Sequence, residues 1–442
     1  MDRLVAGPVV PTLLRLSAPG LLLVAFQSMV SIGDTYFVGR LGTGPLAGLA
    51  LVFPLIMLLQ MTSAGAMGGG VSSAIARALG AGDPARARRL VVHALIIALG
   101  MAAAFTVLVL AFARPLYRLL GGEGESLAHA LAYSNIIFAG AITVWLANTL
   151  SSVLRGTGNM LVPALGLIGG AVVHVPLSGS LVLGLGPMPQ LGIAGAGVAY
   201  VTTFGLAAIA MAVVVFRHSS ALRPGRADLV LEKRLFADIL RVGGLSVLNS
   251  FQVVLTAVVL TGYVGRHGPA ALAGYGVGVR LELLQIPLVF AVGQALVVLV
   301  GTNIGAGNAA RGKHIAWAGA ALAGAICIII GWTVAIFPMA WMGLFSADAG
   351  VLDAGTRYLR IVAPFYPLLG VSIALYFASQ GAGRMLMPVL AGTTRLIVVL
   401  VGGAMAATLT GIFAVVAFGM TVGGLLIAWF VARASWNSGP GP

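Results

Sequence analysis

The sequence predicts an all-α integral membrane protein with twelve transmembrane helices in two pseudo-symmetric six-helix bundles around a central cleft. The first observation is composition: 60% of the 442 residues are hydrophobic and only 8% are charged, whereas a soluble domain carries about 25% charged residues. The second is that apolar stretches of about 20 residues, each able to cross about 30 Å of hydrocarbon, recur from end to end. The third is an internal repeat that divides the chain into two halves.

The apolar stretches form twelve expected spans, separated by charged, glycine-rich or proline-containing loops. They cover residues 16–38, 46–76, 90–113, 128–153, 160–185, 191–216, 239–263, 270–302, 315–338, 357–379, 386–408 and 411–432. The 62 glycines fit this assignment, because small residues let transmembrane helices approach closely. The single cysteine, Cys327, allows no internal disulfide and is expected to be a small buried side chain.

The distribution of basic residues predicts the topology. With the N-terminus inside, 17 of the 25 Lys and Arg residues lie on the inner side, six lie on the outer side, and Arg280 and Arg395 lie within spans. The positive-inside rule then places both termini in the cytoplasm, and we expect a prokaryotic cytoplasmic (inner) membrane. The net charge of +14 is thereby assigned to topology, and no nucleic-acid partner is expected.

Three pairs of segments show that the chain repeats itself. VGRLGTGPLAG at 38–48 returns as VGRHGPAALAG at 264–274, ALGAGDPARAR at 78–88 as NIGAGNAARGK at 303–313, and LRGTGNMLVP at 154–163 as SQGAGRMLMP at 379–388. The shift is 225 or 226 residues each time. Because each half contains an even number of helices, the halves run in the same direction and should be related by an axis along the membrane normal.

The repeat also predicts the domain organisation. Residues 1–216 form an N-lobe with helices 1–6, and residues 239–442 form a C-lobe with helices 7–12. The polar segment 217–238 is expected to be a cytoplasmic linker with a short interfacial helix. Within the lobes, the GAGD and GAGN loops are expected to be tight turns with glycine at positive φ, in which Asp83 and Asn308 cap the following helix. Two bundles with a cleft between them are typical of a transporter.

Only two of the 11 acidic residues, Asp34 and Glu282, lie within the spans. A charge at the bilayer centre costs at least about 2.5 kcal/mol, so each is a functional hypothesis. Burial favours the neutral form of a carboxyl group, so Asp34 can take up a proton outside and release it inside, or bind Na⁺ or an organic cation. The alternative for Asp34 is a structural carboxylate that meets Arg40, and for Glu282 a structural ion pair.

Pro19 lies fifteen residues before Asp34. A proline inside a helix removes a backbone hydrogen bond and weakens the helix at that point. Pro19 is therefore a candidate hinge through which protonation of Asp34 bends the first helix. The alternative is that Pro19 only starts that helix.

Five segments resemble the multidrug and toxic compound extrusion (MATE) family: SIGDTYFVGRLG, GVSSAIARALGAGD, LRGTGNMLVP, LGIAGAGVAY and VGTNIGAGNAARGKH. The resemblance covers essentially the whole chain. It implies a secondary antiporter, and not an enzyme, that exports lipophilic or cationic drugs and toxic compounds by alternating access in exchange for H⁺ or Na⁺. It also implies that Asp34, which matches the acid of the family's first helix, carries the coupling.

The sequence departs from the family's usual fifth-helix motif, in which Asn is followed by Asp four residues later. Here the motif reads HVPLS, with His174 and Ser178 in those places. The second acid of a two-carboxylate site is therefore missing, and His174 either titrates near neutral pH or is a packed polar residue. Gln252 stands where the sodium-coupled branch has Glu, whereas Glu282 and Arg395 resemble the DinF-like branch.

With few carboxylates to hold Na⁺, we expect H⁺ as the coupling ion, Na⁺ at Asp34 as the alternative, and neither another metal nor a cofactor. Candidates for substrate contact are polar or aromatic residues in the matching helices: Tyr36, Asn148, His174, Ser178, Tyr200, Gln252, Glu282 and Arg395. The expected partners are small organic cations or other amphipathic compounds and membrane lipids, and the protein is expected to be a monomer. The alternative function is a lipid-linked precursor flippase of the same MOP superfamily, which would need a more basic cavity.

Overall fold

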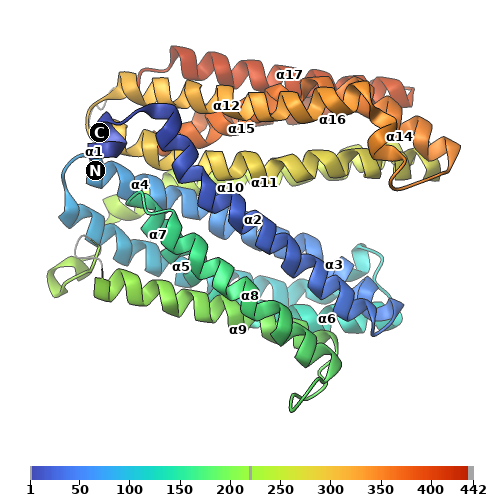
Figure 1. The fold of residues 1–442 in the computed structure, drawn as a ribbon, viewed down its shortest axis with the longest axis horizontal. Coiled ribbons are helices and arrows are strands. Elements are labelled where there is room, and N and C mark those ends of the chain that lie inside the picture. The colour runs from blue at the N-terminus through green and yellow to red at the C-terminus, as the bar shows by residue number, and fades with distance from the viewer. Residues whose placement is uncertain (1, 219–221, 437–442) are drawn as a thin grey trace. The chain divides into compact units, whose positions relative to one another are not determined.

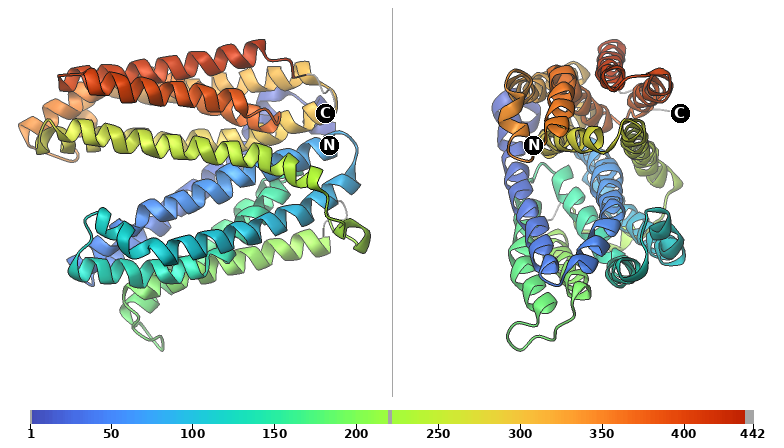
Figure 2. Two further views of the ribbon diagram at one scale, coloured as in Figure 1. Left: turned by 180° about the vertical axis from the view of Figure 1, so that it is seen from behind. Right: turned by 90° about the vertical axis from the view of Figure 1, so that its right-hand side faces the viewer.

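The computed structural model describes residues 2–218 and 222–436, and its regular structure over these ranges is helical, without strands (Figures 1 and 2). Within these ranges, eleven helical segments are long and apolar enough to cross a membrane. The count is twelve when α6 (Gly124–Ala139) and α7 (Ala141–Gly156), which meet at an angle of 49°, are taken as one span. The prediction of an all-α protein with twelve membrane spans is therefore confirmed.

Each predicted span lies largely within an observed helix or chain of helices, and several helices begin six to eight residues earlier than predicted. In chain order the other spans are α2 (Val9–Gly39), α3 (Thr43–Gln60) continued by the π-helical turn η1 (Met61–Met67) and α4 (Gly68–Gly80), α5 (Pro84–Leu119), α8 (Leu161–Leu183), α9 (Ile193–Val213) with η2 (Val214–His218), α10 (Lys233–Gly265), α11 (Pro269–Gly305), α12 (Ala309–Ile336), α14 (Ala349–Val362) continued by η4 (Ala363–Phe365) and α15 (Tyr366–Gly381), α16 (Leu386–Met405) and α17 (Leu409–Arg433). The short elements are α1 (Asp2–Ala6), η3 (Arg226–Leu229) and α13 (Pro338–Met342).

The chain folds into two compact units whose boundaries follow the repeat. One unit comprises Ala18–Gly243, and the other comprises the residues up to Ser17 together with those from Gly244 onward. The chain thus passes from one unit to the other within α2, before Ala18, and within α10, before Gly244. These positions are 226 residues apart and are equivalent in the repeat. The residues before Ala18, placed in the N-lobe by the sequence, pack with the C-terminal half.

Equivalent arginines hold the segments that lead into these two helices. In the C-terminal unit, Asn303 Nδ2 donates to the carbonyl of Leu4 at 3.0 Å and Arg311 donates to the carbonyl of Gly7. In the N-terminal unit, Arg86, the repeat counterpart of Arg311, donates to the Asp238 carboxylate at 2.9 Å. Each unit therefore binds the start of a helix whose remainder belongs to the other unit.

The two predicted capped turns are confirmed. Asp83 Oδ1 accepts a hydrogen bond from the backbone N–H of Arg86 at 2.8 Å, and Asn308 Oδ1 accepts one from Arg311 at 3.1 Å. The preceding glycines, Gly82 and Gly307, have φ values of 73° and 77°. Only glycine adopts this left-handed conformation without a steric cost, which explains why the GAG sequence occurs in both halves.

The first helix extends further toward the N-terminus than the sequence indicated. It begins at Val9, so Pro19 lies inside α2, and the interpretation that Pro19 starts the helix is wrong. Pro19 also follows the unit boundary at Ala18 by one residue. A proline in a helix interior removes one backbone hydrogen bond, and the hinge at Pro19 stays a prediction.

The linker is attached to the N-terminal unit by ion pairs. Within the predicted linker, η3 is one short 3₁₀ turn, and α10 already begins at Lys233. Asp228, Glu232 and Asp238 each bind arginines of the α4–α5 region, through the pairs Arg88–Asp228 (3.1 Å), Arg89–Glu232, Arg77–Asp238 (2.7 Å) and Arg86–Asp238 (2.9 Å). The buried His93 accepts at Nε2 the backbone N–H of Glu232 at 2.9 Å. These contacts fix the backbone of the linker against the bundle.

The carboxylate of Asp228 predicts a pH-dependent contribution to stability. The backbone N–H of Gly225 and the Arg88 guanidinium hold the pKa of the Asp228 carboxyl below its usual range. A lowered folded-state pKa means that the stabilisation is fully present above the unfolded-state pKa of about 3.9 and is lost as the pH falls through the folded-state pKa. Asp228→Asn should therefore lower the midpoint of thermal unfolding at neutral pH, and the difference from wild type should shrink below about pH 4.

Thermal unfolding in detergent at a series of pH values measures this difference. Arg226→Gln is the matched control, since Arg226 is an exposed neighbour outside the ion pairs. A destabilisation by Asp228→Asn that stayed constant into strong acid would contradict the assigned role of the carboxylate charge.

Candidate functional site

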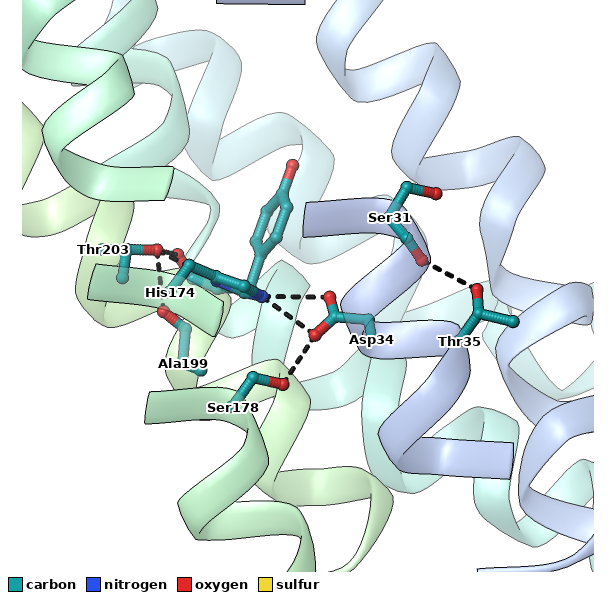
Figure 3. Close-up of polar contacts among 8 residues, drawn as sticks. Ser31, Asp34, Thr35, His174, Ser178, Ala199 and Thr203 are labelled. Carbon is teal, nitrogen blue, oxygen red and sulfur yellow. Dashed lines mark hydrogen bonds and ion pairs between the residues drawn. The ribbon is translucent and has the colours of Figure 1, made fainter. Parts of the chain in front are cut away.

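Helices α2 and α8 bring Asp34, His174 and Ser178 together inside the N-terminal unit (Figure 3). His174 Nε2 lies 3.0 Å from each of the two carboxylate oxygens of Asp34, and Ser178 Oγ donates to Oδ1 at 2.5 Å. Asp34 is 7% exposed and His174 is 2% exposed. His174 and Ser178 are one helical turn apart and therefore face the same side of α8. The fifth-helix positions named from the sequence thus contact the candidate coupling acid.

The contact of His174 Nδ1 with Thr203 indicates the tautomer of the ring. His174 Nδ1 lies 3.3 Å from Thr203 Oγ1, and Thr203 Oγ1 itself lies 2.8 Å from the carbonyl oxygen of Ala199 (Figure 3). A hydroxyl has one proton to donate, and the carbonyl can only accept it. Thr203 Oγ1 is therefore the acceptor for the N–H at Nδ1. The other nitrogen, Nε2, faces the carboxylate of Asp34.

A second polar group adjoins this site through Tyr200 of α9. The rings of His174 and Tyr200 meet edge to face, with centroids 6.4 Å apart. Gln60 Nε2 donates to the Tyr200 hydroxyl at 2.6 Å, while Asn148 Nδ2 donates to Gln60 Oε1 at 3.0 Å and to Ser63 Oγ at 2.8 Å. Gln60 precedes the π-helical turn η1, and such turns occur frequently at functional sites. Asn148 therefore belongs to this group and does not bind Asp34.

The remaining candidates near Asp34 lie apart from its carboxylate. Tyr36 is 58% exposed, and its hydroxyl accepts a hydrogen bond from Arg40 at 3.4 Å. Within the described ranges the ion-pair partner of Asp34 is His174. The interpretation of Asp34 as the structural partner of Arg40 is therefore wrong.

The candidates of the C-terminal unit have partners of their own. Gln252 Nε2 donates to Thr393 Oγ1 at 2.7 Å, and Glu282 Oε2 accepts the hydroxyl of Tyr358 at 3.1 Å. Tyr358 packs edge to face against Tyr275 and Phe413, with centroids 5.3 and 5.2 Å apart. These contacts place Glu282 beside a cluster of aromatic rings.

The other intramembrane charges of this unit do not pair with Glu282. Arg280 lies over the ring of Phe345 at 5.8 Å, and Arg395 packs against Gly423 of α17, where an added Cβ would lie 3.4 Å from its side chain. Among the described residues, no ion pair within 4.0 Å joins Glu282 to Arg395. The structural ion pair that the sequence offered as the alternative for Glu282 is therefore not formed with Arg395 within that distance.

Sequence reasoning missed three residues of these groups: Thr203, Gln60 and Tyr358. Thr203 lies one helical turn after Tyr200, and Gln60 is a polar residue inside an apolar span. Both signals were present in the sequence, because a polar side chain in a membrane span needs an internal partner. Which polar residue meets which partner depends on how the helices pack, and no local pattern shows that.

Comparison with known proteins supports one family for the whole chain. The MatE family model matches residues 19–179 and 246–405, which together make up most of the sequence. The chain belongs to the MatE family. The two matched ranges start 227 residues apart and begin just after the unit boundaries at Ala18 and Gly244.

Individual MatE relatives cover nearly the whole length. The FAD transporter of Shewanella oneidensis is 26% identical over 404 residues, which span 90% of this chain and 88% of that protein. NorM of Thermotoga maritima, a probable multidrug resistance protein, is 25% identical over 387 residues, spanning 86% and 81%. A crystal structure of MATE in complex with MaL6 matches the fold with a TM-score of 0.87 at 23% identity, covering 98% of this chain and 97% of that one.

As a MatE protein, the chain is a multi-pass membrane transporter and not an enzyme, as the sequence predicts. Its assignment to the DinF-like branch of the family remains a prediction.

The hydrogen bond between Gln60 and Tyr200 predicts a measurable contribution to stability. Tyr200→Phe removes the hydroxyl and leaves the Gln60 amide without that acceptor, which should cost about 1–3 kcal/mol of folding free energy. The test is the shift in the unfolding midpoint of the purified protein. Tyr36→Phe is the matched control and should have little effect, because that side chain is exposed. Equal shifts in the two variants would contradict the structural role of Tyr200.

Proposed function

We propose that this transporter is a proton-coupled antiporter that exports lipophilic or cationic compounds by alternating access, with Asp34 as the coupling carboxylate and His174 as its proton partner. The observation that carries the proposal is the contact of His174 Nε2 with both Asp34 oxygens at 3.0 Å in a buried setting. The family assignment supports transport, and the multidrug relative from Thermotoga maritima supports small organic substrates.

The protonation state of the Asp34–His174 pair can change how α2 and α8 contact each other. With Nδ1–H donated to Thr203, one further proton shared between Asp34 and His174 makes the pair neutral overall and completes their hydrogen bond. Loss of that proton leaves the lone pair of Nε2 facing a carboxylate, which is repulsive. Release of the proton therefore weakens the contact between α2 and α8. Pro19, in the same helix as Asp34, gives α2 a point at which it bends.

The donor set around Asp34 supports H⁺ over Na⁺. Oxygen atoms are the ligands of hard cations, but the imidazole nitrogen of His174 already contacts both carboxylate oxygens. A proton requires only the pair itself. In the same proposal, the protein works as a monomer without a cofactor, surrounded by lipid, in a prokaryotic cytoplasmic membrane with both termini inside.

Neutralising Asp34 tests the coupling role. Asp34→Asn keeps the volume of the side chain but removes its titration, so energised efflux of ethidium from proteoliposomes should be abolished while expression and folding persist. Asp83→Asn is the matched control and should transport normally, since Asn308 caps the equivalent turn. Wild-type efflux by purified Asp34→Asn would refute the proposal.

The coupling ion is tested in buffers without sodium. We expect drug efflux to follow an imposed ΔpH in Na⁺-free proteoliposomes and to decline as the pH on the proton-supplying side rises, because the Asp34–His174 pair then stays unprotonated. Efflux that is absent at every ΔpH and appears when Na⁺ is added outside would show that sodium is the coupling ion.

Glu282 predicts a dependence on substrate charge. If its carboxylate acts as a counter-charge beside the aromatic rings of Tyr275, Tyr358 and Phe413, Glu282→Gln should weaken the transport of cationic drugs more than that of neutral ones. Tyr358→Phe, which removes the hydrogen bond but keeps the charge, should preserve the preference for cations. Equal losses for both classes of drug in Glu282→Gln would instead indicate a structural role.

A further inference from the structure

Residues 222–241, which comprise the described part of the linker after residue 221 and the first turns of α10, carry acidic and basic side chains with different partners. The three acids, Asp228, Glu232 and Asp238, are all bound to arginines of the same unit. The basic residues are exposed and, within the described part of the chain, have no ion pair or side-chain hydrogen bond. They are Arg223, Arg226, Lys233, Arg234 and Arg241. The charged side chains of this segment that lack an ion-pair partner among the described residues are therefore all basic.

An exposed apolar stretch lies between these basic residues. Leu229, Val230 and Leu231 are 59%, 60% and 56% exposed, and they are flanked by Arg226 on one side and Lys233 on the other. The backbone that carries them is fixed, because Asp228 and Glu232 are tied to Arg88 and Arg89. A rigid surface that presents apolar side chains between basic ones has the composition of a segment that lies in a membrane interface.

The position of the segment brings it to the membrane surface. It connects η2, at the end of one span, with α10, at the start of the next, and it lies at the helix ends beside the α4–α5 turn (Figure 2). The apolar part of α10 begins near Ile239, six residues after Lys233, which is about 9 Å along the helix. The headgroup region of one leaflet is about 5–8 Å thick, so Lys233 lies at its outer edge if α10 runs along the membrane normal.

From these observations we infer that residues 223–234 form a docking surface for anionic phospholipid headgroups of the surrounding membrane. The basic side chains bind the lipid phosphates, and Leu229, Val230 and Leu231 enter the interface between headgroups and acyl chains. Clusters of four or more basic residues next to a transmembrane helix bind anionic membranes, and each residue raises the affinity about five-fold. The ion pairs of the three acids keep their negative charge off this surface.

The full-length protein with Cys327→Ser and Val230→Cys allows a direct test, since Cys327 is the only native cysteine. Labelled with an environment-sensitive fluorophore, residue 230 should emit at shorter wavelength in vesicles of phosphatidylcholine with phosphatidylglycerol than in phosphatidylcholine alone. The added variant Arg226→Gln/Lys233→Gln/Arg234→Gln should lose this blue shift. Salt near 1 M, where the Debye length is about 3 Å, should reduce the shift in the parent protein.

Arg114→Gln/Arg118→Gln/Arg360→Gln is the matched control, because it also removes three exposed arginines without touching the linker, and it should keep the blue shift. A size-exclusion profile that matches that of the parent protein serves as the check that each variant is folded. The same emission in both kinds of vesicle would overturn the inference, as would an unchanged shift in the linker variant. The same blue shift could also appear when a soluble acidic peptide is added to the protein in vesicles of phosphatidylcholine alone. That result would overturn the inference and assign the surface to a protein partner. None of these readouts uses transport, so they are independent of the coupling ion.

Discussion

The absence of water from the bilayer interior is the constraint on which this structure depends. Each polar group left unsatisfied in hydrocarbon costs several kcal/mol. The backbone therefore forms helices throughout the spans, and the ion pairs of the linker, such as Arg88–Asp228, lie at the helix ends. Among the described acidic residues of the N-terminal unit, Asp34 differs because it lies inside a membrane span. It is tolerated in a buried position because His174 and Ser178 satisfy both of its carboxylate oxygens.

The same constraint connects the Asp34–His174 contact to its surroundings. The ring of His174 is held by Thr203 at one nitrogen and by Asp34 at the other, so α8 is connected to both α9 and α2 through one side chain. Tyr200 lies against the same ring and binds Gln60. The side chain of His174 thus contacts residues of two neighbouring helices, whereas the exposed Tyr36, only two residues from Asp34, remains outside this group.

Local features were readable from the sequence, and contacts between helices were not. The twelve spans follow from the length of the apolar runs, and the caps at Asp83 and Asn308 act within three residues. The bond between His174 and Asp34 joins residues 140 apart, so the sequence could only leave His174 open. The two wrong interpretations differ in origin. The start of α2 at Val9 lies in the other compact unit, which the apolar run alone does not show. Arg40 contacts Tyr36, its neighbour one helical turn away, in place of Asp34.

The crossing of the chain between the two units has a consequence for biosynthesis. Leu4 and Gly7 are held by Asn303 and Arg311, which follow them by 299 and 304 residues. At a synthesis rate of about 5–20 residues per second, these partners emerge roughly 15–60 s later. The start of the first helix thus spends that time in the ribosome-bound chain without its final neighbours. The nascent N-terminus must be kept available, and its docking onto the α11–α12 turn is one of the later steps in assembly of the transporter.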